Sequence, residues 1–302
     1  MYGDWVLSYP GIEYRFGPQA RAVELRGWAF AADSFRVDDA SMPRRDGLAF
    51  GRDYVDAGEL RIEVKIDFTT LPLPAEDRAR MAWDARMGLA SAWRADNLRG
   101  RPREVAELVM GGQQMIEGRP RRVSFDDKHQ GRGLIYASAT FLPSSTAVYV
   151  VDESGVAPWR EQTVGLVPAL LGGGLVAPLV APLSTAVEST RAAPFTVGGD
   201  TDVWPVISVQ GPIQSGAQVE LTGRWALKLA RALAYDEVAT IDARPGRRLM
   251  EVNGRGGNLL TPSSVPLSQA SIPPGLNQIA LRGASVEGTA TATVRWREQK
   301  AG

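Results

Sequence analysis

The strongest pattern along the chain is an alternation of apolar and polar residues with a period of two. It is clearest in segments 59–68 and 289–298, where charged or hydroxyl side chains alternate with apolar ones. The apolar positions are Leu60, Ile62, Val64, Ile66, Phe68, Ala290, Ala292, Val294 and Trp296. Such alternation predicts β-strands with one buried face and one exposed face.

Other segments have the apolar and β-branched character of strands, separated by turn residues. They are 20–30, 131–141, 146–152, 203–211, 218–223 and 224–232. Pro205 lacks a backbone N–H, so its strand is expected at a sheet edge or to begin there. Gly, Pro, Asn and Asp between the segments favour hairpin connections. The pattern therefore predicts an all-β chain with one exception.

The exception is segment 72–96, which has helical periodicity, with the helix itself expected over 74–96. Pro74 suits the first turn, and Glu76 and Asp77 oppose the positive end of the helix dipole. The predicted apolar stripe consists of Ala82, Ala85, Leu89 and Trp93, with Trp83, Met87 and Ala90 beside it. A face of this width is typical of a helix that covers a sheet or barrel.

An uncharged stretch, 164–183, separates the two strand-rich halves. It has the length of a membrane span, but three prolines and three consecutive glycines disfavour a helix there. We therefore predict an N-terminal domain (1–163), a Pro/Gly-rich connector (164–189) and a C-terminal domain (190–302). The connector is expected to lie extended against one domain, because its apolar residues would otherwise form a large exposed patch.

Composition narrows the function. The formal net charge is zero and the pI is about 6.7, which argues against a nucleic-acid binder. The absence of cysteine excludes disulfides and thiol chemistry, and His129 is the one histidine. The N-terminus lacks the basic segment of a secretory signal, and no membrane insertion is expected.

Segment 239–254 holds a group of polar side chains that could carry chemistry: Asp242, Arg244, Arg247, Arg248, Glu251 and Asn253. It could form an anion or substrate site, or a hairpin with a decorated turn. The turn residues Pro245–Gly246 and a second Asn-Gly turn at 253–254 favour the hairpin. We then expect the three arginines to be solvated, and Asp242 and Asn253 to hold the loops by hydrogen bonds.

Other candidate chemistry is weaker. Asp126, Asp127 and His129 in 124–133 are too few for a metal site and favour a solvated loop. Segment 254–258 is rich in glycine but lacks the Lys-Ser/Thr of a phosphate-binding loop. An acid pair such as Asp38–Asp39 could serve glycoside hydrolysis, but chance pairs are expected among 34 acidic residues. Tryptophans lie beside arginines at 93–94, 159–160, 224–225 and 295–297 and are expected mainly in the core, with a minority at interfaces. We predict no catalytic, cofactor-binding or metal-binding residues and no cofactor.

A set of motifs in the second half occurs in a familiar order. They are VISVQGPI (206–213), WALKLARAL (225–233), Ile241-Asp242, Val252-Asn253-Gly254, the Pro274, Gly275 and Asn277 of segment 272–283, and the alternating strand at the end. The first half adds an MPRRDG turn (42–47) before strand 59–68 and its helix. With these motifs the chain resembles the distal tail proteins of long-tailed bacteriophages, the siphovirus-type phage tail component family.

The resemblance implies an all-β fold with one main helix. It implies a ring-forming β-barrel or split-barrel domain at 1–163 and a galectin-like β-sandwich at 190–302. It further implies a structural virion protein without enzymatic activity, which forms a ring, typically a homohexamer, at the distal end of the tail. Such a protein is assembled in the host cytoplasm and connects the tail tube to the tail tip, the baseplate and the adsorption apparatus.

The partners implied are further copies in a closed ring, the tail tube protein, the tail hub or tail-associated lysin, the tape measure protein, and receptor-binding or fibre proteins. Carbohydrate binding to the host surface by the C-terminal domain is the alternative left open, and a hydrolase is a third, weaker one. The galectin sugar-binding pattern is absent, since His129 lies in the other domain. The residues that make the ring contacts are not predicted.

Overall fold

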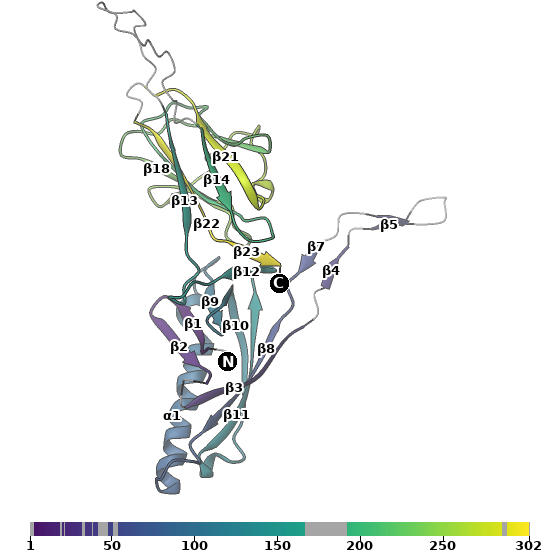
Figure 1. Ribbon diagram of the computed structural model, residues 1–302, viewed down its shortest axis with the longest axis vertical. Coiled ribbons are helices and arrows are strands. Elements are labelled where there is room, and N and C mark those ends of the chain that lie inside the picture. The colour runs from purple at the N-terminus through teal and green to yellow at the C-terminus, as the bar shows by residue number, and fades with distance from the viewer. Residues whose placement is uncertain are drawn as a thin grey trace, which may run out of the picture. The chain divides into compact units, whose positions relative to one another are not determined.

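The computed structural model describes residues 3–18, 20, 22–31, 34–37, 39–41, 48–50, 54–166, 192–285 and 289–301. The chain forms two compact units, Met1–Ala157 with Ala301–Gly302, and Pro158–Lys300. Both are built mainly from β-strands, and the one long helix of the described part is α1 (Ala75–Arg94) in the first unit (Figure 1). No helix of the described part is long and apolar enough to span a membrane.

The first unit contains a curved antiparallel sheet, a helical segment and a hairpin arm. Its strands are β1 (Trp5–Tyr9), β2 (Ile12–Phe16), β3 (Val23–Phe30), β4 (Ser34–Arg36), β5 (Ala40–Ser41), β6 (Leu48–Ala49), β7 (Tyr54–Asp56), β8 (Leu60–Asp67), β9 (Ala106–Met110), β10 (Gln114–Asp126), β11 (Leu134–Pro143) and β12 (Ala147–Val150). After α1 come the short helices α2 (Asp96–Arg99) and η1 (Gln130–Arg132). The sheet order is β2-β1-β9-β10-β11-β8-β3, and β12 pairs with β10.

The strand predicted at 59–68 is confirmed as β8. Its apolar residues Leu60, Ile62, Val64, Ile66 and Phe68 are all buried, and its charged residues lie on the opposite face. β8 lies inside the sheet, paired antiparallel with β11 on one side and β3 on the other. The period-two pattern therefore identifies the face of the sheet that forms the core.

The predicted helix is confirmed, and it covers this apolar face. α1 packs across β2, β8, β10 and β11 (Figure 1). Trp93 is 1% exposed, and its indole N–H donates a hydrogen bond to the Thr140 carbonyl of β11 at 2.9 Å. The predicted apolar face is too wide, since Trp83 and Met87 are 42% and 47% exposed. The helix ends where Ala95 adopts a left-handed conformation (φ 49°).

A closed barrel in the first unit is not found. Among the described residues no ladder joins the two end strands, β2 and β3, so the sheet stays open. Side chains of α1 share the core with both ends of the sheet, and they fill the space that strand closure would otherwise enclose. The MPRRDG turn at 42–47 lies outside the described residues.

The second unit is a sandwich of two antiparallel sheets. Its elements are β13 (Arg160–Gly165), β14 (Ala192–Val197), β15 (Val206–Gln210), β16 (Gln218–Leu221), β17 (Trp225–Lys228), β18 (Val238–Asp242), β19 (Leu249–Val252), β20 (Arg255–Gly256), η2 (Leu267–Gln269), β21 (Gly275–Arg282) and β22 (Thr291–Trp296), followed by β23 (Gln299–Ala301). One sheet has the order β13-β22-β15-β18-β19-β20 and the other β14-β21-β16-β17.

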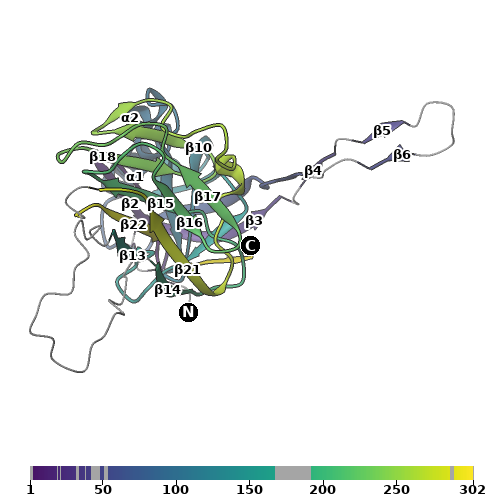
Figure 2. The same ribbon diagram turned by 90° about the horizontal axis from the view of Figure 1, so that it is seen from above.

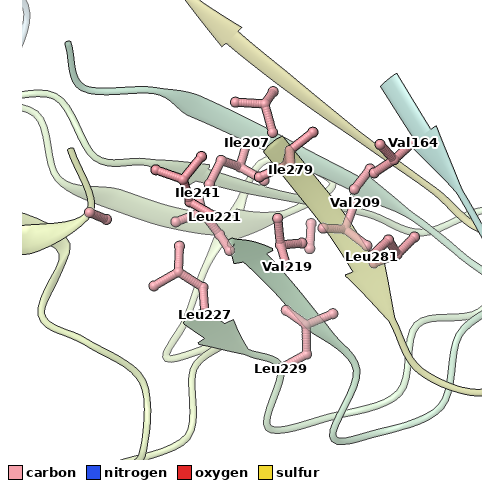
Figure 3. Close-up of a cluster of buried hydrophobic side chains, with 14 of the residues drawn as sticks. Val164, Ile207, Val209, Val219, Leu221, Leu227, Leu229, Ile241, Ile279 and Leu281 are labelled. Carbon is pink, nitrogen blue, oxygen red and sulfur yellow. The ribbon is translucent and has the colours of Figure 1, made fainter. Parts of the chain in front are cut away.

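The two sheets share one apolar core. Figure 3 shows Ile207, Val209 and Ile241 of one sheet facing Val219 and Ile279 of the other, and all five are buried. The strand predicted at 289–298 is confirmed as β22, with Ala292, Val294 and Trp296 buried. The expected exposure of every second residue fails at Arg297, which is only 8% exposed, beyond the end of β22.

The unit boundary lies at Ala157/Pro158 rather than after residue 163. β13 pairs along its length with β22, and Val164 and Leu166 are buried in the core of the sandwich. Residues 160–166 therefore belong to the second unit, because their apolar side chains complete its core. The rest of the predicted connector, from residue 167 on, lies outside the described residues.

Two tryptophans of α1 test the role of the buried helix face. Trp93→Ala should lower the free energy of unfolding of the first unit by about 3–5 kcal/mol, because it removes a large buried side chain and leaves a cavity. Trp83→Ala, on the same helix, should cost less than about 1 kcal/mol, because Trp83 is half exposed. Denaturant titration followed by circular dichroism measures both, and equal losses would show that α1 does not hold the sheet in this way.

Candidate functional site

The polar segment 239–254 forms the hairpin predicted from its sequence. β18 and β19 pair antiparallel, with Ile241 opposite Met250 and Asp242 opposite Leu249. The turn contains Gly246 at φ 79°, a left-handed conformation that suits glycine. The hairpin interpretation is therefore confirmed.

Asp242 and Arg244 form a buried ion pair at the start of this turn. Each is 8% exposed, and Arg244 Nη2 lies 2.6 Å from Asp242 Oδ2. The backbone N–H of Arg244 also donates to Asp242 Oδ1 at 3.0 Å. The expected loop-holding role of Asp242 is confirmed. The expectation that Arg244 is solvated is wrong, because a paired guanidinium can be buried.

The guanidinium groups of three arginines surround the half-buried Trp159. Those of Arg244, Arg295 and Arg297 lie 5.1, 5.1 and 4.6 Å from its ring centroid. The Arg295 Nε is also 3.7 Å from a Glu161 carboxylate oxygen. All three guanidinium groups contact the Trp159 ring, and those of Arg244 and Arg295 are also ion-paired. This Trp–Arg cluster therefore has a structural role in the second unit.

The second turn, Asn253-Gly254, is fixed by the Asn253 side chain. Its Oδ1 accepts a hydrogen bond from the Val238 N–H at 2.9 Å, and its Nδ2 donates to the Asp236 carbonyl at 3.2 Å. Asn253 and Gly254 both adopt left-handed conformations, with φ of 48° and 75°. The predicted hydrogen-bonding role of Asn253 is confirmed.

Beyond this turn lies a polar groove of about 600 Å³. It is lined by Arg231, Glu237, Val252, Asn253, Arg255, Gly256, Gly257, Asn258 and Leu259. Glu237 is held in place by the Ala234 N–H at 3.0 Å and by Arg231 Nη2 at 2.5 Å. The Ala234 N–H, and next the Arg231 guanidinium, lower the pKa of the Glu237 carboxyl, so this group is ionised at neutral pH.

The other candidates from the sequence do not come together as sites. Asp127 pairs with Arg86 at 3.1 Å, Asp126 accepts from the Lys128 N–H at 3.3 Å, and His129 is exposed beside η1. Asp39 is exposed, whereas Asp38 lies outside the described residues. No group of three His, Cys, Asp or Glu side chains in the described part is arranged to hold a metal.

The predicted core position is confirmed for four of the eight tryptophans, whereas Trp28 and Trp83 are exposed and Trp159 and Trp204 are half-buried. Trp5, Trp93, Trp225 and Trp296 are buried, and Trp225 donates its indole N–H to the Ser271 carbonyl at 2.6 Å. Segment 254–258 forms β20 and the turn after it, and no helix begins in the eight residues that follow it, all of which are described. The helix N-terminus of a nucleotide-binding loop is therefore absent from this segment.

The first unit carries an apolar surface that the sequence analysis missed. β4 pairs with β7, and β5 with β6, in a hairpin arm that continues from β3 and β8 and extends away from the sheet (Figures 1 and 2). Phe50 on this arm is 85% exposed, and Val37 and Val55 are about half exposed. Trp28 and Phe30 on the edge strand β3 are also exposed. The strands of the arm are too short for alternation to reveal them.

An apolar recess of about 300 Å³ lies near the root of the arm. It is lined by Phe30 at the end of β3 and Ala31 after it, Ala57 and Gly58 before β8, and Ile116, Pro143, Ser145, Thr146, Ala147 and Val148. An isolated two-stranded ribbon is only marginally stable in water. The arm therefore exposes apolar side chains that the described part of the chain does not cover, and an apolar recess lies near them.

No family model matches the chain, and no curated protein matches it. Among solved structures, the chain is similar to the Dit protein of phage SPP1, described as a paradigm of the hub adsorption apparatus in phages that infect Gram-positive hosts. The TM-score is 0.53 at 11% identity, with 98% of both chains covered, so the two share a fold. A chain of the phage P2 baseplate in its activated conformation with calcium gives a TM-score of 0.47 at 10% identity, over 98% of both chains, which is too low to bear on the fold.

The Asp242–Arg244 pair provides a test of this region. Asp242→Ala should lower the free energy of unfolding of the second unit by about 3–5 kcal/mol, because it leaves a buried guanidinium without its counter-ion. Glu251→Ala on the adjacent strand should change it by less than about 0.5 kcal/mol, because Glu251 is partly solvated. Chemical denaturation measures both values. A double variant lacking Asp242 and Arg244 should be less destabilised than the sum of the two single variants, and strict additivity would contradict a coupled pair.

Proposed function

We propose that the chain is a structural virion protein, the distal tail ring that connects a phage tail tube to the tail tip and baseplate with its adsorption apparatus. The observation that carries this proposal is the shared fold with SPP1 Dit over 98% of both chains. Because identity is only 11%, the role itself is inferred from the fold together with the surfaces of the first unit. The location proposed is the distal end of the tail in the virion.

The proposal assigns a role to each part of the chain. The first unit, within residues 1–163, is the ring-forming domain, an open sheet of split-barrel type. The second, Pro158–Lys300, is a galectin-like sandwich that braces other baseplate components, and the part of the predicted connector 164–189 that follows Leu166 lies in sequence between its strands β13 and β14. The two-sheet sandwich with one shared core and the open antiparallel sheet covered by α1 support these assignments.

A ring requires a head-to-tail interface that closes on itself, so each copy must present two different surfaces. The first unit has two such surfaces, since β2 and β3 end its sheet at opposite edges. Unpaired strand edges favour association with another chain. The arm, with Phe50 exposed, and the recess near Phe30 give one copy an apolar projection and the next a place to receive it.

The remaining partners are part of the same proposal: the tail tube protein, the tail hub or tail-associated lysin, the tape measure protein, and receptor-binding or fibre proteins. A non-enzymatic role is supported by the dispersal of the candidate polar groups. Asp242 and Arg244 are occupied with each other, and Asp127 is paired with Arg86. The ring is proposed to be a homohexamer.

The experiment is negative-stain electron microscopy of the purified full chain at high concentration and of Phe50→Glu. The wild type should form closed rings, and Phe50→Glu should shift the protein to monomers, because a carboxylate on the arm opposes its burial in an apolar interface. Leu276→Glu is the matched control, since Leu276 is 80% exposed on β21 of the second unit. This variant should form rings as the wild type does.

Melting curves establish that both variants keep their fold, as expected for changes at exposed positions. Rings that persist in Phe50→Glu, or that are lost equally in Leu276→Glu, would contradict the assignment of the arm to the interface. A wild type that stays monomeric, alone and on isolated tail tubes, would contradict the ring.

A further inference from the structure

The polar groove of the second unit has the features of a small-molecule site that the proposed ring does not use. Its volume of about 600 Å³ lies within the range of sites that hold small ligands. Its walls come from the loop 231–237 and from the segment Asn253–Leu259, which follows the hairpin β18–β19. Both walls are fixed to each other, because Asn253 bonds to Val238 and Asp236 at the end of the loop.

Two glycines keep the groove open although the fold does not require glycine at either position. Gly256 and Gly257 line the groove, and neither has a left-handed φ. A Cβ added to Gly257 would meet no atom within 4 Å, and one added to Gly256 would meet only the Met250 carbonyl oxygen, at 3.9 Å. Glycine at these positions therefore leaves space and an accessible backbone rather than satisfying a packing constraint.

The charges of the groove favour an anion. The negative charge of Glu237 is balanced by Arg231, whose Nη2 lies 2.5 Å from a Glu237 carboxylate oxygen. Arg255 is exposed and has no ion-pair or hydrogen-bond partner for its side chain among the described residues. A free guanidinium offers a planar fork of donors that matches a carboxylate or phosphate in two parallel hydrogen bonds.

The other polar groups suit hydroxyls. Asn258 lines the groove beside the two glycines, and its Oδ1 accepts a hydrogen bond from the Leu260 N–H at 3.4 Å, which leaves its Nδ2 to donate to a ligand. Tyr235, on the loop whose ends Arg231 and Glu237 line the groove, is 68% exposed. Its ring does not line the groove itself, but an exposed aromatic ring on the adjoining loop offers an apolar face against which a bound sugar ring can pack.

We propose that this groove binds an acidic saccharide, with Arg255 holding its carboxylate or phosphate group, Asn258 and the backbone holding its hydroxyls, and Tyr235 packing on a sugar ring. Carbohydrate binding was the alternative left open by the sequence, and the groove assigns it to particular residues. The proposal is independent of the ring, since all of the groove residues belong to the second unit.

Isothermal titration calorimetry on the full chain tests it with three probes: trigalacturonic acid for the carboxylate, glucose 1-phosphate for the phosphate, and maltotriose as the neutral control. At least one acidic probe should bind with a Kd of about 1 mM or lower, and maltotriose at least about tenfold more weakly. The acidic probe that binds identifies which anionic group the groove takes. High salt should weaken the binding, because ions screen an exposed charge pair.

Arg255→Ala should weaken binding of the acidic probe by roughly tenfold or more. Arg255→Lys should weaken it less, because lysine keeps the positive charge but lacks the planar pair of donors of a guanidinium. Arg224→Ala is the matched control, since Arg224 is an exposed arginine of the same unit outside the groove, and it should bind within about twofold of the wild type. Gly257→Leu should abolish binding by filling the groove while leaving the melting temperature unchanged.

Each of three results would overturn the proposal. They are no binding of either acidic probe up to about 10 mM, equal binding of maltotriose, and unchanged affinity in Arg255→Ala. If Gly257→Leu proves unstable, the comparison of Arg255→Ala with Arg224→Ala decides the question without it. Ring formation in the same variants should be unaffected, so failure of this proposal and failure of the ring are distinguished.

Discussion

The constraint on which the first unit depends is that an antiparallel sheet which does not close has two edges. Backbone N–H and C=O groups along an edge strand must be paired or solvated. The apolar stripe of α1, with Leu89 and Trp93 buried, covers one face of the sheet and stabilises it in its open form. The edges β2 and β3 are then each paired on one side only among the described residues, and the hairpin arm exposes apolar side chains such as Phe50.

The second unit satisfies its constraints internally. Its two sheets bury each other's apolar faces, so no large helix is needed to cover them. The polar groups that remain at its surface are organised by short-range bonds, such as those of Asn253 to Val238 and Asp236. The proposed groove lies in the second unit and the proposed ring interface in the first. Ligand binding in the groove therefore does not require a change in the core of the first unit, and ring assembly does not require a change in the core of the second.

The sequence predicts most clearly the elements whose pattern is long and regular. β8 and α1 were identified with their buried residues, because eight and twenty residues of unbroken periodicity define a face. Trp83 and Met87 were placed wrongly because the apolar stripe of a helix does not reveal how far the sheet beneath it extends. Arg244 was placed wrongly because burial of a charge depends on the geometry of its partner, here Asp242, only two residues away. The arm was missed because its strands are too short to show alternation. The groove was missed because only the folded structure shows which residues surround Arg255.

Immunogold electron microscopy of phage tails that carry this protein tests the central claim most directly. Antibodies against the full chain should label a single position, the distal end of the tail tube where it meets the tip. That result follows if the open sheet and the arm close into a ring on the end of the tube. Label along the tube, at the end nearest the head, or absent from tails altogether would contradict the account.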